Sequence, residues 1–150
     1  MQRYNAQSPY RLLILLLFTG LAVLLVSPAL AGQGVTISAD GDKSYYLGEK
    51  VVLRGQNTDS DSTYLFLTGA SPVPASGVNL TSPGNAVVSG NPDSFTVVKT
   101  RPDKTWEYSW YTANLPLYAG SYTLYAVSQP KATDQAGTAA ASIGIIVKKP

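Results

Sequence analysis

Residues 32–150 consist of short runs in which apolar and polar side chains alternate. The clearest run is 105–112, where Trp106, Tyr108 and Trp110 stand at every second position. A period of two is typical of a β-strand with one buried face, whereas an amphipathic helix repeats its apolar residues at spacings of three and four. Clusters of Gly, Pro, Asn and Asp separate the runs, as turns separate strands. The sequence therefore predicts an all-β domain.

The runs amount to about seven principal strands, the number typical of an immunoglobulin-like β-sandwich. They are expected at residues 35–39, 50–56, 63–68, 94–100, 105–112, 121–129 and 142–147, and a shorter run at 45–47 leads into a turn. The stretch 69–94 contains four prolines and is long for a structureless loop. Short edge strands are therefore expected inside it, at 78–80 and 86–89.

A tyrosine corner is predicted at Tyr122, which follows a Gly turn at the start of a long strand. In such a corner the tyrosine hydroxyl bonds to the backbone a few residues upstream. Leu124 stands two residues further on, where an antibody domain has its second cysteine, and this chain contains no cysteine. Leu124 is expected to face Val52 or Leu53 across the core, as an apolar substitute for the disulfide.

The N-terminal segment, residues 1–31, has the layout of a secretory signal peptide. Arg3 and Arg11 make its start basic, an apolar run covers 12–26, and the small residues of the Ala29-Leu30-Ala31 site follow. A permanent membrane anchor is the alternative interpretation. A spanning helix needs about 20 apolar residues, however, and this run is shorter. Cleavage after Ala31 is expected.

Cleavage would leave one β-sandwich domain, 32–150, outside the cell and without a membrane anchor of its own. Arg3 and Arg11 are the two basic residues in excess of the nine acidic ones, so this domain has no net charge. A neutral domain argues against nucleic acid as a partner, because nucleic acids are bound by clustered Lys and Arg. It argues equally against an anionic membrane surface.

Several kinds of chemistry are excluded by composition. The chain contains neither His nor Cys, which removes the Ser-His-Asp triad, thiol nucleophiles and the usual zinc sites. Glu49 and Glu107 are its glutamates, and nothing in the sequence pairs them as a glycosidase requires. The sequence predicts a non-enzymatic domain that needs no cofactor.

The aromatic run has two interpretations. Trp106, Tyr108 and Trp110 could form an exposed platform on which sugars stack, or they could fill the core of a sandwich. Strict alternation favours the core, because a half-buried strand must fill it at every second position. Tyr111, on the opposite face, would then be the exposed aromatic residue of this strand.

Two acidic loops are weak candidates for calcium. Asp40 and Asp42 flank one glycine, and Asp59 and Asp61 flank one serine. Carboxylates one residue apart can share a calcium ion, but Asp is also a common turn residue. Neither loop has the ligand spacing of an EF-hand, so the sequence predicts no defined metal site.

Asn79 begins the single N-x-[ST] sequon of the chain. In an exported protein this asparagine is a candidate glycan site. Chance occurrence of so short a pattern is the alternative.

Four stretches resemble domains of S-layer-type surface glycoproteins of methanogenic archaea: Ser44–Val51, Gly55–Thr58, Asp103–Trp110 and Ala119–Ser128. The similarity extends over nearly all of the domain. It implies an extracellular, glycosylated, non-enzymatic role in the cell envelope, with no catalytic residues to transfer. Proteins of this type usually carry further domains and a C-terminal anchor, so a single unanchored domain is expected to be held in place by partners.

The leading hypothesis is a cell-surface structural or interaction domain whose partners are other envelope or surface proteins, with glycans as a further class. The alternative is an extracellular carbohydrate-binding module that uses Trp and Tyr residues. The exposure of Trp106 and Trp110 distinguishes the two hypotheses, because a binding platform must be accessible.

Overall fold

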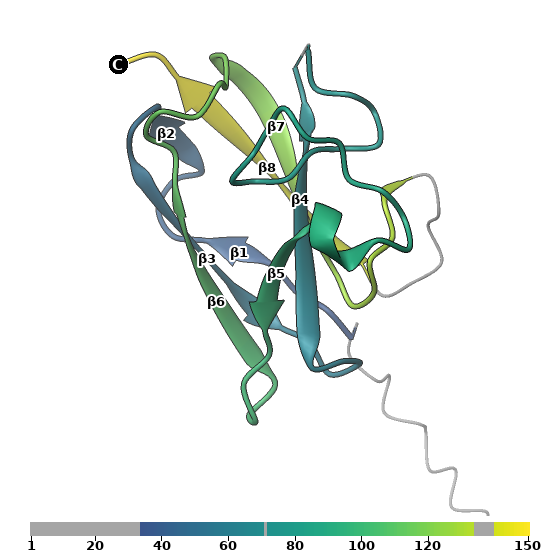
Figure 1. Ribbon diagram of the computed structural model, residues 1–150. Coiled ribbons are helices and arrows are strands. Elements are labelled where there is room, and N and C mark those ends of the chain that lie inside the picture. The colour runs from purple at the N-terminus through teal and green to yellow at the C-terminus, as the bar shows by residue number, and fades with distance from the viewer. Residues whose placement is uncertain (1–33, 71, 134–139) are drawn as a thin grey trace, which may run out of the picture. The chain divides into compact units, whose positions relative to one another are not determined.

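The computed structural model describes residues 34–70, 72–133 and 140–150, all within a compact unit that comprises Gly32–Pro150. These residues form eight β-strands and a short 3₁₀ helix (Figure 1). The elements are β1 (Ser38–Ala39), β2 (Ser44–Tyr46), β3 (Lys50–Gln56), β4 (Ser62–Gly69), η1 (Pro92–Ser94), β5 (Thr96–Lys99), β6 (Thr105–Tyr111), β7 (Gly120–Val127) and β8 (Ala140–Lys148).

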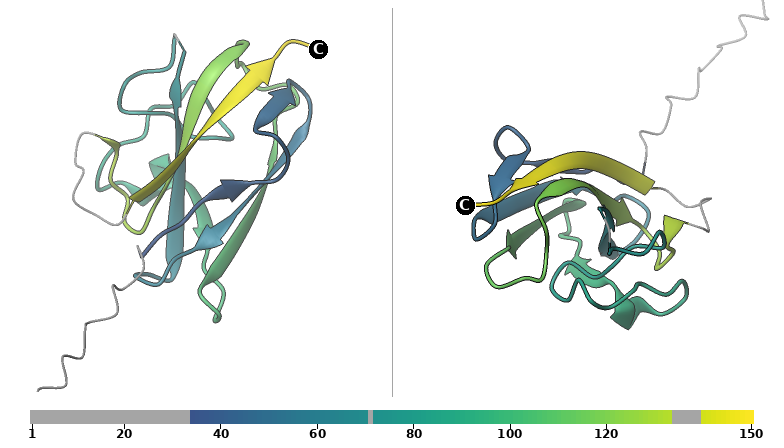
Figure 2. Two further views of the ribbon diagram at one scale, coloured as in Figure 1. Left: turned by 180° about the vertical axis from the view of Figure 1, so that it is seen from behind. Right: turned by 90° about the horizontal axis from the view of Figure 1, so that it is seen from above.

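The strands pair into two sheets that form a β-sandwich (Figure 2). One sheet has the order β1-β3-β6 and the other the order β2-β8-β7-β4-β5. All pairs are antiparallel except β2 with β8. Immunoglobulin-like sandwiches separate their second and fifth strands from the third, sixth and seventh. Here β3 and β6 are separated from β4, β7 and β8 in the same way. The prediction of an all-β sandwich is confirmed.

Side chains from both sheets meet in one apolar core. Leu53 of β3 and Leu124 of β7 are both completely buried in it, whereas Val52 lies on the opposite face of β3 and is half-buried. Of the two partners expected for Leu124, the structure therefore selects Leu53 as the core residue. Burial of each leucine contributes about 1.5–3 kcal/mol, without any covalent link between the sheets.

Most strand ends shift by one or two residues from the expected ones, and two predicted strands are clearly shortened. The predicted strand 35–39 is reduced to Ser38–Ala39, because Val35 makes only a single pairing with Asn57. The predicted strand 94–100 is reduced to β5, because Pro92 begins the 3₁₀ helix η1. The side chain of Asn91 caps this helix by accepting a hydrogen bond from the Asp93 N–H.

The edge strands expected at 78–80 and 86–89 are wrong. Val78 forms single pairings with Leu67 and Ala86, and no ladder extends from them. After Val78, the Asn79 N–H donates to the Asn85 carbonyl at 3.1 Å, whereas the Leu80 N–H donates to the Thr96 side-chain Oγ1 at 3.1 Å. Side-chain partners thus satisfy backbone groups that a strand would have paired.

The signal peptide expected at residues 1–31 lies outside the described residues. Among the residues that are described, no helix has the length and apolar character needed to cross a membrane.

Candidate interaction surface

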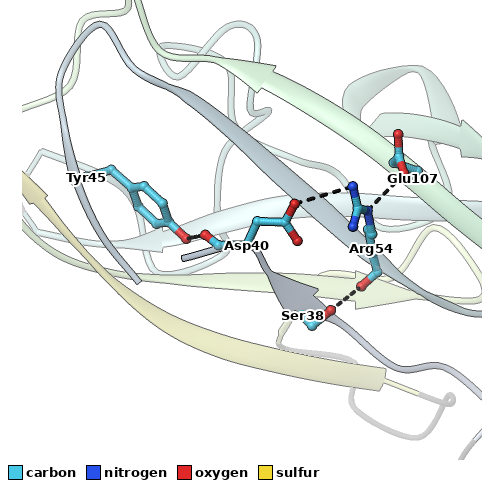
Figure 3. Close-up of polar contacts among 5 residues, drawn as sticks. All are labelled: Ser38, Asp40, Tyr45, Arg54 and Glu107. Atoms are coloured by element: carbon cyan, nitrogen blue, oxygen red, sulfur yellow. Dashed lines mark hydrogen bonds and ion pairs between the residues drawn. The ribbon is translucent and has the colours of Figure 1, made fainter. Parts of the chain in front are cut away.

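The outer face of the three-stranded sheet carries a charged cluster around Arg54 (Figure 3). Arg54 Nε donates to Glu107 Oε2 at 2.9 Å, and the β3–β6 register places these two residues opposite each other. Its Nη2 lies 3.3 Å from Asp40 Oδ2. The Arg54, Asp40 and Glu107 side chains are 52%, 51% and 37% exposed, so each ion pair contributes at most about 1 kcal/mol. Glu107 and Asp40 thus share one cation, Arg54, on an open surface.

The first acidic loop is used for local structure. The Tyr45 hydroxyl donates to the Asp40 carbonyl at 2.5 Å (Figure 3), and Asp42 Oδ1 accepts from the Ser44 N–H at 2.9 Å. Burial, followed by the negative charges of Asp42 and Asp40, raises the pKa of Tyr45. Both carboxylates therefore lie beside the turn into β2, where one pairs with Arg54 and the other accepts a backbone hydrogen bond.

The second acidic loop is folded around the buried amide of Asn57. Asn57 Oδ1 accepts from the backbone N–H groups of Asp59 at 3.0 Å and Ser60 at 3.1 Å. Its Nδ2 donates to the Ser62 carbonyl at 2.9 Å and lies 3.0 Å from both Ser60 Oγ and Thr63 Oγ1. One side chain thus satisfies three backbone groups of the turn. The sequence reasoning missed this role, because a polar residue beside a turn carries no sign of burial.

The four calcium candidates do not gather into a site. Within residues 34–70, 72–133 and 140–150, no three Asp, Glu, His or Cys side chains lie close enough to hold a metal ion. Calcium takes six to eight oxygen ligands, far more than either pair supplies. Asp40, Asp42, Asp59 and Asp61 are best understood as turn residues.

The aromatic strand β6 is a core strand. Trp106 and Trp110 are each 1% exposed, Tyr108 is partly buried against the same core, and Tyr111 is 66% exposed. Trp106 Nε1 donates to the Gln56 carbonyl at 3.3 Å. The two tryptophans are therefore core residues and do not form a carbohydrate platform.

Tryptophan fluorescence gives a direct check, because the chain has two tryptophans and both are buried. We expect blue-shifted emission from the native protein and weak quenching by acrylamide, and both properties should change on unfolding in urea. Quenching as strong in the native as in the unfolded protein would contradict this burial.

A second apolar cluster covers part of the outer face of the five-stranded sheet. Phe66 of β4 stacks on Tyr125 of β7 with ring centroids 4.8 Å apart, and Phe95 meets both Phe66 and Tyr64 edge to face. Val87 lies in the same cluster, so the stretch before η1 packs on this face. The sequence signal was the continuous apolar run in β4, which indicates a strand buried on both faces.

The segment between β4 and β5 is tied to the other sheet by Trp110. Its Nε1 donates to the Leu80 carbonyl at 2.9 Å in a buried environment. Leu80 is itself fully buried in the main core. One indole therefore links two positions 30 residues apart in the sequence.

Asn79, the sequon residue, is half-buried and hydrogen-bonded at both ends of its amide. Its Oδ1 accepts from the Thr81 N–H at 2.9 Å and from Thr96 Oγ1 at 3.0 Å, and its Nδ2 donates to the Ser94 carbonyl at 3.2 Å. Nδ2 is the atom to which an N-linked glycan would be attached. A glycan at Asn79 would replace one of the two hydrogens of this nitrogen and leave a single N–H to donate to the Ser94 carbonyl.

Tyr122 is buried at the start of β7, and its hydroxyl donates to the Tyr118 carbonyl at 2.7 Å. This bond, four residues upstream, is the geometry of a tyrosine corner. Burial raises the pKa of Tyr122 above its usual value.

The raised tyrosine pKa values predict how stability depends on pH. A group that is neutral when protonated, and whose pKa is raised by folding, stabilises the fold below its unfolded pKa and loses this contribution as pH rises through the folded pKa. We expect the free energy of unfolding to fall as the pH rises above about 10, and Tyr122→Phe to reduce this dependence. Urea titrations between pH 8 and pH 11 measure it, and an unchanged slope in the variant would contradict the assignment.

A shallow groove lies on the uncovered part of the five-stranded sheet. It has a volume of about 330 Å³ and is lined by Asp42, Lys43, Ser121, Tyr122, Thr123, Gly144, Ile145 and Ile146. Open space lies above Gly144, since a Cβ at this position would meet nothing within 4 Å. The groove is broad and open, with small hydroxyl side chains and no carboxylate pair suited to acid-base work.

Four strands lie at sheet edges: β1 and β6 in one sheet, and β2 and β5 in the other. β6 is the longest of them, with seven residues, against four, three and two for β5, β2 and β1. An edge strand presents unpaired backbone N–H and C=O groups to its surroundings. β6 is therefore the principal candidate interaction edge of the domain.

Comparison with protein-family models finds no match, and comparison with curated protein sequences finds none. Among solved structures, the chain is similar to BslA, a bacterial hydrophobin, with 18% sequence identity and a TM-score of 0.37, over 78% of this chain and 94% of that one. It is also similar to a CARDB domain from Pyrococcus furiosus, solved in complex with di-metal ions. There the identity is 12% and the TM-score 0.33, over 75% of this chain and 89% of that one. Both likenesses are distant.

Proposed function

We propose that residues 32–150 act as a non-catalytic interaction domain on the outside of the cell. In this proposal, segment 1–31 exports the chain and is then removed. The domain works in an envelope of the kind that S-layer-type surface glycoproteins form, and its partners are other envelope or surface proteins.

The free edge of β6 is the observation that carries this proposal. β6 is a seven-residue strand at the edge of its sheet, and its residues Glu107 and Tyr111 have exposed side chains. The balance of positive and negative charge in the domain also supports close packing against neighbours, because little long-range repulsion opposes it.

The use of polar side chains points in the same direction. Within the described part of the chain, every buried side-chain nitrogen or oxygen has a hydrogen-bond partner. Asn57 and Tyr122 illustrate this, since their polar atoms all serve the fold.

The carbohydrate-binding alternative now depends on exposed tyrosines instead of tryptophans. Among the described residues the exposed tyrosines are Tyr46, Tyr111 and Tyr118, which come from β2, β6 and the β6–β7 connection. Tyr46 already carries the ammonium group of Lys148 over its ring at 4.3 Å. The exposed aromatics thus belong to three separate elements, which favours the interaction domain as the better-supported proposal.

The location of the native protein tests the proposal. Cells are separated into cytoplasm, envelope and medium, and intact cells are treated with protease, with a cytoplasmic protein as the control for lysis. We expect the protein in the envelope fraction and open to protease on intact cells. A protein found in the cytoplasm and protected from protease would overturn the proposal.

A further inference from the structure

We infer that the occupant of the β6 edge is a second copy of this domain, whose own β6 pairs with it antiparallel about a two-fold axis at Ser109. The inference rests on the proposed interaction role and names the partner. It follows from which backbone groups are free, from the side chains beside them and from the charges that each register would bring together.

The hydrogen bonds of β3 show which backbone groups of β6 are free. The carbonyls of Val52 and Gln56 accept from the N–H groups of Asp40 and Thr36, so the even-numbered residues of β3 bond toward β1. Hydrogen bonds alternate sides along an antiparallel strand. The odd-numbered residues of β3 therefore bond toward β6, where the register places them opposite Trp106, Tyr108 and Trp110.

The residue that follows each of these three points its backbone groups away from β3. These residues are Glu107, Ser109 and Tyr111, and no hydrogen bond from the described chain reaches their N–H or C=O groups. Tyr111 is largely exposed and Ser109 is half-exposed. These three alternate positions of a regular strand thus each offer one backbone donor and one backbone acceptor.

Backbone pairing and charge together select one register. Axes at Tyr108 or Trp110 would pair only two of the three positions, because the third would face Thr105, whose N–H and C=O are already bonded, or would lie beyond the end of the partner strand. A two-fold axis at Ser109 places Ser109 opposite itself and Glu107 opposite Tyr111 of the second copy, so all three positions pair. An axis at Glu107 would place two carboxylates directly opposite each other, which is destabilising. An axis at Tyr111 would leave Glu107 beyond the end of the partner strand. With the axis at Ser109, Glu107 keeps its ion pair to Arg54 and meets no like charge.

Cysteine cross-linking tests the register, because the chain has no cysteine of its own. Opposite residues in a hydrogen-bonded antiparallel pair have Cα atoms about 5.5 Å apart, within reach of a disulfide. Ser109→Cys is therefore expected to form disulfide-linked dimers on mild oxidation. Tyr111→Cys is the matched control on the same strand, since its two copies would lie about 13 Å apart. Mixing Glu107→Cys with Tyr111→Cys should restore cross-linking.

Sedimentation of the purified protein between about 10 μM and about 1 mM tests the association without cross-linking, over the range of a weak interface. We expect a reversible dimer for the native chain and a monomer for Ser109→Lys, which brings two ammonium groups together at the axis. Val97→Lys, on the exposed face of the other edge strand β5, should leave the dimer intact. Circular dichroism checks that each variant is folded.

The outcomes separate this inference from the proposed function. A native protein that stays monomeric throughout, or Ser109→Cys and Tyr111→Cys cross-linking at equal rates, overturns self-pairing. If that protein is still exposed on the envelope, the interaction domain stands with a different partner. A cytoplasmic protein overturns the interaction role whatever its oligomeric state.

Discussion

Trp110→Ala is expected to lower the free energy of unfolding by about 3–5 kcal/mol, the range for truncating a buried aromatic residue. The indole is 1% exposed and lies in the main core, so its removal leaves a cavity between the two sheets. It also leaves the buried Leu80 carbonyl without its 2.9 Å partner. Urea unfolding followed by far-ultraviolet circular dichroism measures the change.

Two variants separate the contributions. Trp110→Phe keeps most of the apolar volume but removes the N–H, so we expect a loss of about 1–3 kcal/mol from the unpaired carbonyl and the smaller ring. Tyr111→Ala changes the adjacent residue, whose side chain is exposed, and should alter stability by no more than about 0.5 kcal/mol. Equal effects of Trp110→Ala and Tyr111→Ala would contradict the assignment of faces on β6.

Asn57→Ala is expected to cost about 3 kcal/mol, although it removes only one small polar side chain. The truncation leaves the N–H groups of Asp59 and Ser60 without their acceptor, and the Ser62 carbonyl keeps only the Ser60 hydroxyl as a partner. A buried polar group without a partner costs about 1–3 kcal/mol, and partial opening of the turn to water limits the sum. Urea titration at pH 7 provides the measurement.

Asn91→Ala is the matched control for this change. Asn91 also accepts a backbone hydrogen bond, from Asp93 at 3.2 Å, but it is exposed at the start of η1. Water can replace its contact, so we expect a loss of about 1 kcal/mol or less. A loss for Asn57→Ala no greater than for Asn91→Ala would mean that the buried network does not hold the turn.

Local sequence patterns correctly predicted two features of the fold: the buried and exposed faces of β6, and the tyrosine corner. The alternation in 105–112 correctly assigned Trp106 and Trp110 to the core and Tyr111 to the surface. The Gly turn before Tyr122 pointed to the residue whose hydroxyl bonds to Tyr118. Each feature involves residues that are close together in the chain, so one short stretch of sequence is enough to predict it.

The parts that were missed depend on residues far apart in the chain. The strands expected at 78–80 and 86–89 do not form, because Leu80 is held by Trp110 and Thr96, 30 and 16 residues away. The cluster around Phe66 and Tyr125 forms only when the segment between β4 and η1, which carries Val87, folds back over β4. No local pattern carries such pairings, although the unbroken apolar run in β4 signals that both of its faces are buried.

The free edge of β6 follows from topology and not from the residues of β6 themselves. The same alternation would suit a central strand or an edge strand. Only the sheet order, with β3 on one side of β6 and no strand on the other, shows that Glu107, Ser109 and Tyr111 have unpaired backbone groups among the described residues.

The intact mass of the native protein, measured separately for the envelope fraction and the culture medium, tests the central claim most directly. We expect a species in the envelope with the mass of residues 32–150, with or without a glycan. Such a species is exported, has lost its N-terminal segment and is held by partners. The same species found free in the medium instead would contradict the envelope role and would favour a soluble binding module.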